Sequence, residues 1–484
     1  MSVLGLAQKH AEEVVSHLGV EGEAKADLQR FTSAFFRDAL PEELRGLDAA
    51  DMAGIARFAW EAARERQPGR PGIRLESHKM DTDAPGSRRT ILCIVNDDMP
   101  FLVDSVAATL ASRGLTVDRI IHPVLDVRRD GAGVRVETVG PRQGASPADG
   151  LVRESVLYIE LERVGAKDRQ ELLTALEAVL ADVRAAVEDW KPMLGALRTA
   201  TDGLRNDPPP VSADEQAEAV AFLEWLAKDN FTFLGYRYYS YEGDLGDETL
   251  EPKSDLGLGY LRDPDFPVWR GPEGYTQVSP QLREFLMTPE PILVTKSNAL
   301  STVHRRVHMD YVGVKAFRDG RVVGEHRFIG LFTSASYAVS PRSIPMLRRK
   351  VDKVLEACGF DPKGHAGKAL LHVLENFPRD EMVQIDPDQL TQVALGLLSL
   401  IDRPRPKLFL RRDRFERYVS VLCCIPRDLY RSDIRVTVGR MLSAAFQARV
   451  SLFSVELRDD PVARIHFILG TTPGSVPQVD EHDL

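Results

Sequence analysis

One stretch, from Arg89 to Asp130, predicts the fold of the first part of the chain. Its sequence is RTILCIVNDDMPFLVDSVAATLASRGLTVDRIIHPVLDVRRD. Residues 90–95 form a short apolar run with several β-branched side chains, which predicts a buried strand. The next apolar positions recur at helical spacing, at Val103, Val106, Ala107 and Leu110. Gly114 is typical of the position just past a helix end, and residues 115–127 again have the pattern of a strand. The stretch therefore predicts one β-α-β half-unit.

A second half-unit follows. Residues 155–161 are strand-like, and a long helix is then predicted by the apolar stripe Leu172, Leu176, Val179, Val183 and Trp190. Two such half-units build a sheet with helices on one face, the ferredoxin-like plan of small ligand-sensing modules. The same order of strand, polar turn, helix and strands recurs in residues 404–484. This second module lacks a final helix, so we expect it to be unfinished or completed from elsewhere.

The middle of the chain predicts an antiparallel sheet with helices against it. Residues 231–241 form an aromatic-rich strand candidate, and two longer candidates lie at 301–317 and 321–333. Asp319-Gly320 between them is a strong hairpin signal. The charged residues beside this hairpin (Arg318, Arg321, Glu325, His326 and Arg327) are expected on a solvated sheet face, with an anion or interface contact as the alternative.

The predicted fold class is α+β, with several domains. The parts are an N-terminal helical segment and joint at 1–88, a β-α-β module at 89–192, a central antiparallel α+β module at 214–342, a helical segment at 343–403 and a second β-α-β module at 404–484. The joint is the Pro- and Gly-rich stretch 67–88, and the prolines at 208–210 mark a further boundary.

Composition excludes several classes of partner. The 484 residues are 43% hydrophobic and 28% charged, the balance of a soluble globular protein. A net charge of -10 argues against nucleic acid, and acidic residues interrupt the basic cluster at 403–417, which we expect to be a solvated face or a contact between domains. No apolar run approaches the ~20 residues that span a bilayer, and a signal-peptide core is not recognisable. We therefore expect a cytoplasmic protein without a membrane partner.

Motifs for metal, cofactor or catalysis are not recognisable. The four cysteines form no CxxC pair, which favours buried reduced thiols. His304 and His308, in a predicted strand, would lie roughly 13 Å apart, too far to share a metal. Gly257-Leu258-Gly259 lacks the third glycine of a dinucleotide fingerprint, and residues 364–369 lack the hydroxyl residue of a phosphate loop, so we expect a loop before a helix at Leu370. We predict no catalytic, cofactor-binding or metal-binding residue.

Five longer segments resemble one family. They are NDDMPFLVDSV (96–106), FLEWLAKDNFTFLGYRYY (222–239), STVHRRVHMDYVGVKAF (301–317), GEHRFIGLFTSASY (324–337) and RRKVDKVLEACGFDPKGHAGKALLHVLENFPRDEMVQI (348–385). In this order they resemble the N-terminal region of the large bacterial NAD-specific glutamate dehydrogenases. The resemblance implies ACT-like sensing modules around a PAS-like module, with the catalytic domain further downstream and not in this chain. It also implies NAD as the cofactor of the full-length enzyme, and a homo-oligomer.

The resemblance implies a regulatory or assembly role for a chain that is inactive by itself. The alternative is a stand-alone amino-acid-sensing or interaction protein built from ACT-like modules. An amino-acid effector of such modules binds where the first strand meets the first helix, whose N-terminus can hold a carboxylate. In this chain that corner contains Asn96, Asp97, Asp98, Phe101 and Asp104. Helix capping by the Asn and Asp side chains is the simpler expectation for these residues.

Overall fold

The computed structural model of the protein consists of two compact units. It describes residues 23–79, 88–139, 147–242, 249–252, 257–263, 266, 288–458, 460–472 and 475–479. Unit 1 comprises Met1–Val187 and Thr302–Arg306, and unit 2 comprises Glu188–Ser301 and Val307–Leu484. Among the helices in the described ranges, none has the length and apolar character needed to cross a membrane.

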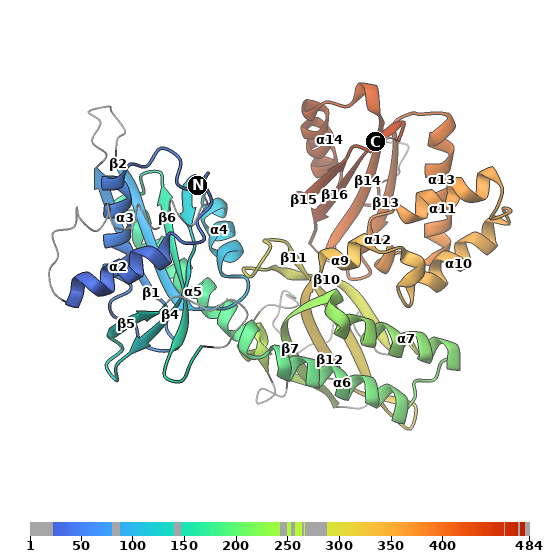
Figure 1. Ribbon diagram of the computed structural model, residues 1–484. Helices are drawn as coiled ribbons and strands as arrows, with labels where there is room; N and C mark the ends of the chain where they lie inside the picture. The colour runs from blue at the N-terminus through green and yellow to red at the C-terminus, as the bar shows by residue number, and fades with distance from the viewer. Residues whose placement is uncertain are drawn as a thin grey trace. The chain divides into compact units, whose positions relative to one another are not determined.

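Unit 1 contains the strand and helix of both predicted half-units (Figure 1). Its elements are β1 Gly72–Lys79, β2 Arg88–Asp97, α4 Leu102–Ser112, β3 Val117–Ile121, β4 Val124–Arg129, β5 Arg135–Val139, β6 Val152–Leu161 and α5 Ala166–Glu188. The strands lie in the order β1-β2-β6-β4-β5, and β3 also pairs with β6. Strand β2 therefore lies between β6 and β1, and β1 precedes both half-units in the sequence.

Three details of unit 1 differ from the predictions. Residues 115–127 form two strands, β3 and β4, because Pro123 between them has no N–H for the ladder. The expected joint at 67–88 contains β1, which pairs with β2 over its whole length. Helix α4 begins after Phe101, whose φ is 71° and whose side chain makes no cap hydrogen bond. The predicted caps Asn96 and Asp97 are instead the last residues of β2. Residues 80–87 of the joint lie outside the described residues, as do Gly140 and Gly144, which we expect in a loop between the two half-units.

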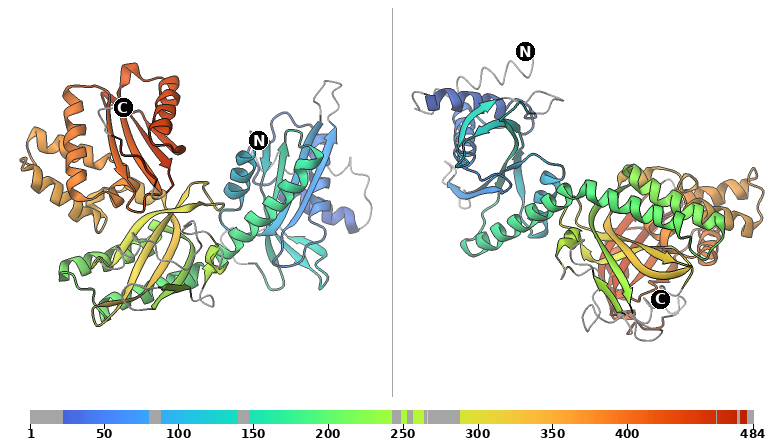
Figure 2. Two further views of the ribbon diagram at one scale, coloured as in Figure 1. Left: turned by 180° about the vertical axis from the view of Figure 1, so that it is seen from behind. Right: turned by 90° about the horizontal axis from the view of Figure 1, so that it is seen from below.

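The sheet of unit 1 is buried on both faces, which corrects the expectation of helices on one face. Helices α2 Glu23–Phe35 and α3 Ala49–Ala62 pack against one set of strand residues, among them Cys93, Val95 and Tyr158. Side chains alternate along a strand, so Ile94 and Ile159 point to the other face, where they are also fully buried. Helix α5 runs across this other face, as the left view of Figure 2 shows.

The central sheet of unit 2 is antiparallel, as predicted. Its strands are β7 Phe231–Glu242, β8 Thr249–Pro252, β9 Leu258–Gly259, β10 Ile292–Leu300, β11 His308–Arg318 and β12 Arg321–Phe332. They lie in the order β10-β11-β12-β7-β8, with β9 on β7. Asp319 and Gly320 have φ values of 51° and 73°, the backbone of a two-residue hairpin, so that prediction is confirmed. The strand expected from residue 301 begins only at His308.

Two helices cover one face of the central sheet. They are α6 Trp190–Asn206 and α7 Ala213–Trp225, which run side by side over the strands (Figure 2). Helix α6 precedes the prolines at 208–210 and α7 follows them. The Pro-rich stretch therefore connects two helices that cover the same sheet, and it does not separate two domains. The division between the compact units falls earlier, at Val187 and Glu188.

Two of the charged residues beside the hairpin are buried, contrary to the expected solvated face. Glu325 accepts hydrogen bonds from Tyr311 Oη at 2.5 Å and from Arg327 Nε at 2.8 Å. The guanidinium of Arg327 lies over the ring of Tyr239, 3.8 Å from its centroid. The reason is that β12 is a central strand, with β11 and β7 on its two sides, so its polar side chains are covered by their neighbours.

The predicted helical segment is present and packs against the second module. Its helices are α10 Leu347–Cys358, α11 His365–Glu375, α12 Arg379–Gln384 and α13 Pro387–Asp402. The second module contains β13 Lys407–Arg412, β14 Tyr418–Pro426, α14 Ser432–Ala445, β15 Arg449–Glu456 and β16 Val462–Gly470, in the strand order β13-β14-β16-β15. Adjacent Cys423 and Cys424 are both buried. They point to opposite faces of the sheet, Cys423 toward α14 and Cys424 toward the helical segment. The face opposite α14 is thus covered from elsewhere in the chain.

Candidate functional site

The predicted effector corner in unit 1 is occupied by ion pairs. Asp97 Oδ1 lies 2.6 Å from Arg66 Nη2, and its Oδ2 lies 2.7 Å from Arg184 Nη2. Burial opposes ionisation of Asp97, but the hydrogen bonds and charges of the two guanidinium groups outweigh it and lower the pKa of the carboxyl. Arg184 also donates to Asn96 Oδ1 at 2.9 Å. Asn96 and Asp97, two residues of the predicted effector corner, therefore bind arginine side chains.

A buried carboxylate extends this network beneath the strands. Glu154 on β6 is 1% exposed and accepts a hydrogen bond from Arg66 at 2.6 Å. It also accepts two from Arg129, at 2.7 Å and 2.8 Å. Arg129 links Glu154 of β6 to β4, and Arg66 links it to Asp97 at the end of β2. Removal of any one partner would leave a buried charge without its counter-ion, so these ion pairs hold the three strands together.

The other predicted corner residues have separate partners. Asp98 accepts a hydrogen bond from Ser155 Oγ at 2.7 Å, and Ser155 Oγ lies 3.0 Å from His122 Nε2. Ser155 is fully buried, so this chain of polar groups is structural rather than a nucleophile open to substrate. Asp104 Oδ2 lies 2.9 Å from Nδ1 of His304. Phe101 contacts the same histidine ring, with centroids 5.3 Å apart.

His304 corrects the sequence-based expectation of a strand histidine. Its φ is 65°, and it lies in the segment 302–306 that packs on the start of α4. Its backbone N–H donates to Ser105 Oγ at 2.9 Å. Among the described residues, no group of three or more His, Cys, Asp and Glu side chains could hold a metal ion.

The two glycine-rich strings do not fit a dinucleotide. Gly259 ends the short strand β9 against β7, and a Cβ there would meet Leu234 O at 2.1 Å. The following residues form a single 3-10 turn rather than the helix whose N-terminus would face a pyrophosphate. Gly364 is the N-cap of α11, which starts at His365 rather than near Leu370, and a Cβ at Gly367 would meet Asp361 O at 2.1 Å. These glycines serve close backbone packing.

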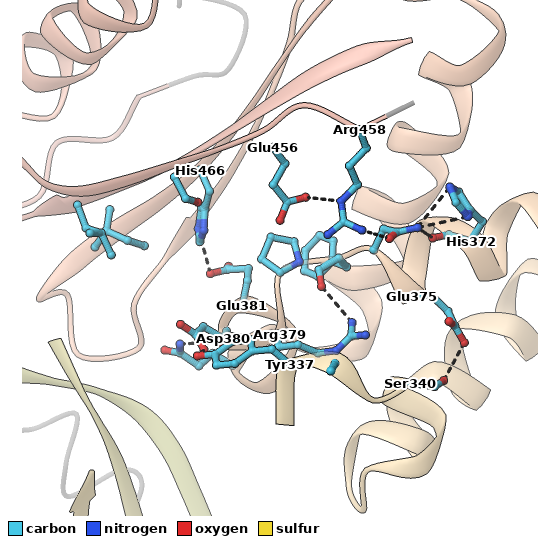
Figure 3. A pocket seen from close by; sticks show the side chains of 18 of the residues that line it. Tyr337, Ser340, His372, Glu375, Arg379, Asp380, Glu381, Glu456, Arg458 and His466 are labelled. Carbon is cyan, nitrogen blue, oxygen red and sulfur yellow. Dashed lines mark hydrogen bonds and ion pairs between the residues drawn. The ribbon is translucent and has the colours of Figure 1, made fainter. Parts of the chain in front are cut away.

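Unit 2 contains a cleft of about 960 Å³ that the sequence did not indicate. Its walls come from β10, the short helix α9 Ser334–Ala338, helices α11 and α12, and the strands of the second module (Figure 3). Charged side chains of both signs line it: Lys296, Lys368, Arg379 and Arg458, with Glu375, Asp380, Glu381 and Glu456. A cleft with this lining suits a small, charged ligand better than an apolar one.

Lys296 of β10 is a largely buried cation in the lining of the cleft. Its Nζ lies 2.6 Å from Asp310 Oδ1 and 2.9 Å from Asp380 Oδ2, and Tyr337 Oη donates to Asp380 at 2.5 Å. Burial raises the pKa of Asp310 to about 6 against the opposing charge of Lys296. Burial also opposes ionisation of Asp380, but Lys296 and Tyr337 outweigh it and lower that pKa. Lys296 therefore holds the central sheet against α12.

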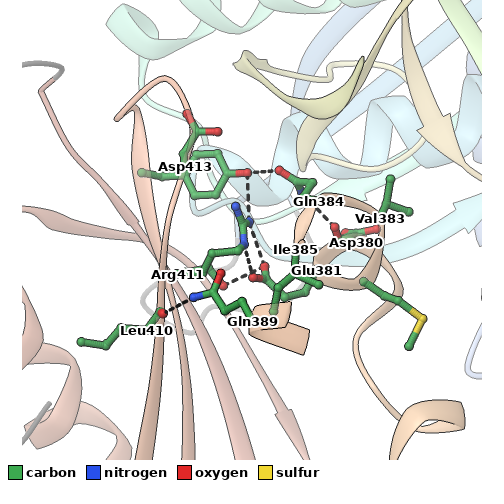
Figure 4. Close-up of polar contacts among 12 residues, drawn as sticks. Asp380, Glu381, Val383, Gln384, Ile385, Gln389, Leu410, Arg411 and Asp413 are labelled. Atoms are coloured by element: carbon green, nitrogen blue, oxygen red, sulfur yellow. Dashed lines mark hydrogen bonds and ion pairs between the residues drawn. The ribbon is translucent and has the colours of Figure 1, made fainter. Parts of the chain in front are cut away.

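A second buried network lies next to it (Figure 4). Glu381 accepts hydrogen bonds from Arg411 Nη2 at 3.1 Å and from Ser420 Oγ at 2.8 Å. Arg411 Nε also pairs with Glu381. Ser420 Oγ lies 2.7 Å from His466 Nε2, and burial lowers the pKa of this imidazole. The network joins α12 to β13, β14 and β16.

The cluster at 403–417 makes contacts between modules, one of the two roles expected for it. Arg411 binds α12, and Arg417 donates to Thr295 Oγ1 at 2.7 Å on β10, an edge strand of the central sheet. Arg417 also pairs with Asp413 at 2.7 Å. The sequence could not indicate the cleft because its lining comes from segments more than a hundred residues apart. The single local signal is the charged triplet Arg379-Asp380-Glu381 at the start of α12.

Comparison with known proteins covers most of the chain. The family models described as glutamate dehydrogenase ACT1 domain, helical motif 1 and ACT2 domain match residues 31–176, 344–403 and 407–484. The ACT1 match begins within α2, so it includes helices that we had expected to precede the module. The match to helical motif 1 coincides with the helical segment predicted at 343–403.

Three similar proteins are named NAD-specific glutamate dehydrogenase. The protein of Halomonas elongata is 35% identical over 96% of this chain and 29% of its own length. That of Pseudomonas aeruginosa is 32% identical over 96% of this chain and 28% of its own length. That of Mycobacterium tuberculosis is 28% identical over 87% of this chain and 25% of its own length. The chain thus spans less than a third of each relative, and it belongs to the NAD-specific glutamate dehydrogenase family, whose N-terminal region with the ACT1 domain, helical motif 1 and ACT2 domain it represents.

Proposed function

We propose that this chain is a regulatory and assembly region of an NAD-dependent glutamate dehydrogenase. The whole enzyme would convert L-glutamate, NAD⁺ and water into 2-oxoglutarate, ammonium and NADH. The observation that carries the proposal is the match to three glutamate dehydrogenase domains along a chain that spans under a third of its relatives. The ACT domains are the part that suggests ligand sensing, and the central sheet would be the PAS-like module between them.

The pairing of the buried carboxylates supports a role that is not catalytic. Glu154, Asp380 and Glu381 are all paired with cations on other elements of their own unit. A general base or nucleophile needs a lone pair that is open to substrate, whereas these carboxylates are committed to structure. NAD would accordingly bind to the part of the enzyme that carries catalysis.

Enzyme activity is the direct test. The purified 484-residue chain is mixed with L-glutamate and NAD⁺, and NADH is followed by its absorbance. We expect no turnover, because the residues described here offer no cradle for a dinucleotide. Glutamate-dependent reduction of NAD⁺ by this chain alone would overturn the proposal.

Assembly and location are the remaining parts of the proposal. We expect a homo-oligomer in the cytoplasm, so light scattering after size exclusion should give a mass above the 53.9 kDa of one chain. A monomer at all concentrations would remove the assembly role and leave sensing.

An amino acid is the effector class that ACT domains favour, but at the unit 1 corner its ammonium group would have to displace a guanidinium from Asp97.

A further inference from the structure

We infer that the cleft of unit 2 binds a small molecule through its carboxylate, with Arg379 as the anchor. This deepens the proposed function, on which it rests for its regulatory meaning, by moving the effector from the unit 1 corner to a different place. The guanidinium group of Arg379 has no counter-ion among the described residues of the chain.

Arg379 stands at the start of α12 and lines the cleft (Figure 3). Two of its N–H groups donate to backbone carbonyls, Nη1 to Phe377 O and Nη2 to Val339 O, both at 3.2 Å. Its Nε is buried and has no hydrogen-bond partner. Within the described part of the chain no carboxylate lies within ion-pair distance of this guanidinium. The group therefore keeps unused donors and an uncompensated charge.

Other buried arginines of unit 2 are paired with a carboxylate, which Arg379 is not. Arg411 is paired with Glu381, Arg417 with Asp413 at 2.7 Å, and Arg464 with Asp460 at 2.9 Å. Burial lowers the pKa of Arg379; among the nearby charges Glu375 raises it most, Arg458 lowers it and Glu456 raises it. Neither glutamate pairs with the guanidinium directly, and its buried Nε has no hydrogen-bond partner, so this position can accept an anion.

A carboxylate is the anion that fits this position. A guanidinium presents five N–H donors in a planar fork, and a carboxylate can accept two of them at once. The buried carboxylates of the cleft have cationic partners, because Glu381 is paired with Arg411 and Asp380 shares Lys296 with Asp310. Lys368 adds positive charge to the lining, and Arg458 lies there as an ion pair with Glu456.

The remaining acidic groups can select among carboxylates. Glu375 accepts a hydrogen bond from Ser340 Oγ at 2.7 Å. Glu456 Oε2 is buried and lies 3.3 Å from Arg458 Nε as an ion pair, without accepting a hydrogen bond. Both glutamates could accept from the ammonium group of an amino acid. The shared chemistry is the carboxylate, and the two sources to distinguish are an amino acid and a carboxylic acid without an amine.

The test uses isothermal titration of the full chain with L-glutamate and, separately, 2-oxoglutarate. The two probes carry the same carboxylates, but only glutamate carries an ammonium group. We expect saturable binding of at least one probe at millimolar concentration. Binding of glutamate alone assigns the ammonium to the acidic residues, and equal binding of both assigns recognition to the carboxylate. Absence of binding by both probes would overturn the inference.

Three variants locate the binding. Arg379→Ala should weaken it roughly tenfold to a hundredfold, the usual effect of losing hydrogen bonds to a charged group. Ser454→Trp places a large ring in the cleft from an exposed position and should abolish binding without altering the unfolding midpoint. Arg431→Ala is the matched control, because that arginine is exposed, lies outside the cleft lining and pairs only with Asp433.

The outcomes separate this inference from the proposed function. Unchanged binding in both Arg379→Ala and Ser454→Trp would place the ligand elsewhere and overturn the cleft site. If Arg379→Ala fails to fold, Ser454→Trp alone decides. NADH production by the chain would instead contradict the proposed function and leave the cleft untouched.

Discussion

Arg411 of β13 and Glu381 of α12 form a buried two-point ion pair that joins the ACT2 sheet to helical motif 1. Figure 4 shows the pair together with Gln384 and Gln389, which come from the same helical segment. Ion pairs of this kind contribute little when compared with apolar residues of the same volume, but they are costly to break on one side only.

Glu381→Gln should destabilise unit 2 by about 3 kcal/mol or more, because it leaves the Arg411 charge buried and unpaired. Urea unfolding followed by circular dichroism measures the loss. The exposed pair Arg205–Asp202 supplies the control, and Asp202→Asn should change stability by no more than about 0.5 kcal/mol. The double variant Glu381→Met, Arg411→Met should recover most of the lost stability, because neither charge is then buried. An equal loss of stability in the single and double variants would show that the unpaired charge of Arg411 is not the cause.

Asp97→Ala should destabilise unit 1 by about 2 kcal/mol, since it removes hydrogen bonds from two guanidinium groups, those of Arg66 and Arg184. The pKa of Asp97 is lowered in the folded state, so the stability from these pairs is present above pH about 4 and is lost as the pH falls. The variant should therefore be less sensitive to acid than the parent chain. Asp98→Ala loses only the hydrogen bond from Ser155 and should have a smaller effect.

His326 should make the central sheet sensitive to mild acid. Burial lowers the pKa of its imidazole to about 4, whereas an unfolded histidine titrates near 6.5. Between these values the unfolded chain binds a proton that the folded chain does not, so stability should fall by about 1.4 kcal/mol per pH unit as the pH drops. In His326→Gln, unfolding measured from pH 7 to pH 5 should lack this component. His372→Gln, at a largely exposed histidine, should behave like the parent.

Gly367→Ala should destabilise the helical segment by about 1–3 kcal/mol, because its Cβ would lie 2.1 Å from Asp361 O. Lys368→Ala, at the next and exposed position, should leave the unfolding midpoint unchanged. If Gly367→Ala leaves stability unchanged and Lys368→Ala abolishes the binding of a nucleotide, residues 364–369 would have a phosphate-binding role. Thermal melts with and without a nucleotide distinguish the two.

The elements of the fold could be predicted where local pattern and tertiary role agree. The apolar run at 90–95, the hairpin at Asp319-Gly320 and the helical stripes of 343–403 depend on periodicity and turn chemistry, and the structure contains all of them. The helix cap predicted at Asn96 and Asp97 was wrong because β2 continues through both residues, where arginines from α5 and from the segment after α3 compete for their side chains.

Sequence alone determined the kinds of module and their order along the chain, because alternation and helical spacing are local properties of the polymer. Only the tertiary structure decided which charges are buried and which side chains share a cleft. Lys296, Asp380 and Arg411 stand far apart in sequence, and each looks like an ordinary surface residue there. Their pairing follows from sheets and helices that pack in three dimensions, since a buried charge is tolerated only where another element brings its partner.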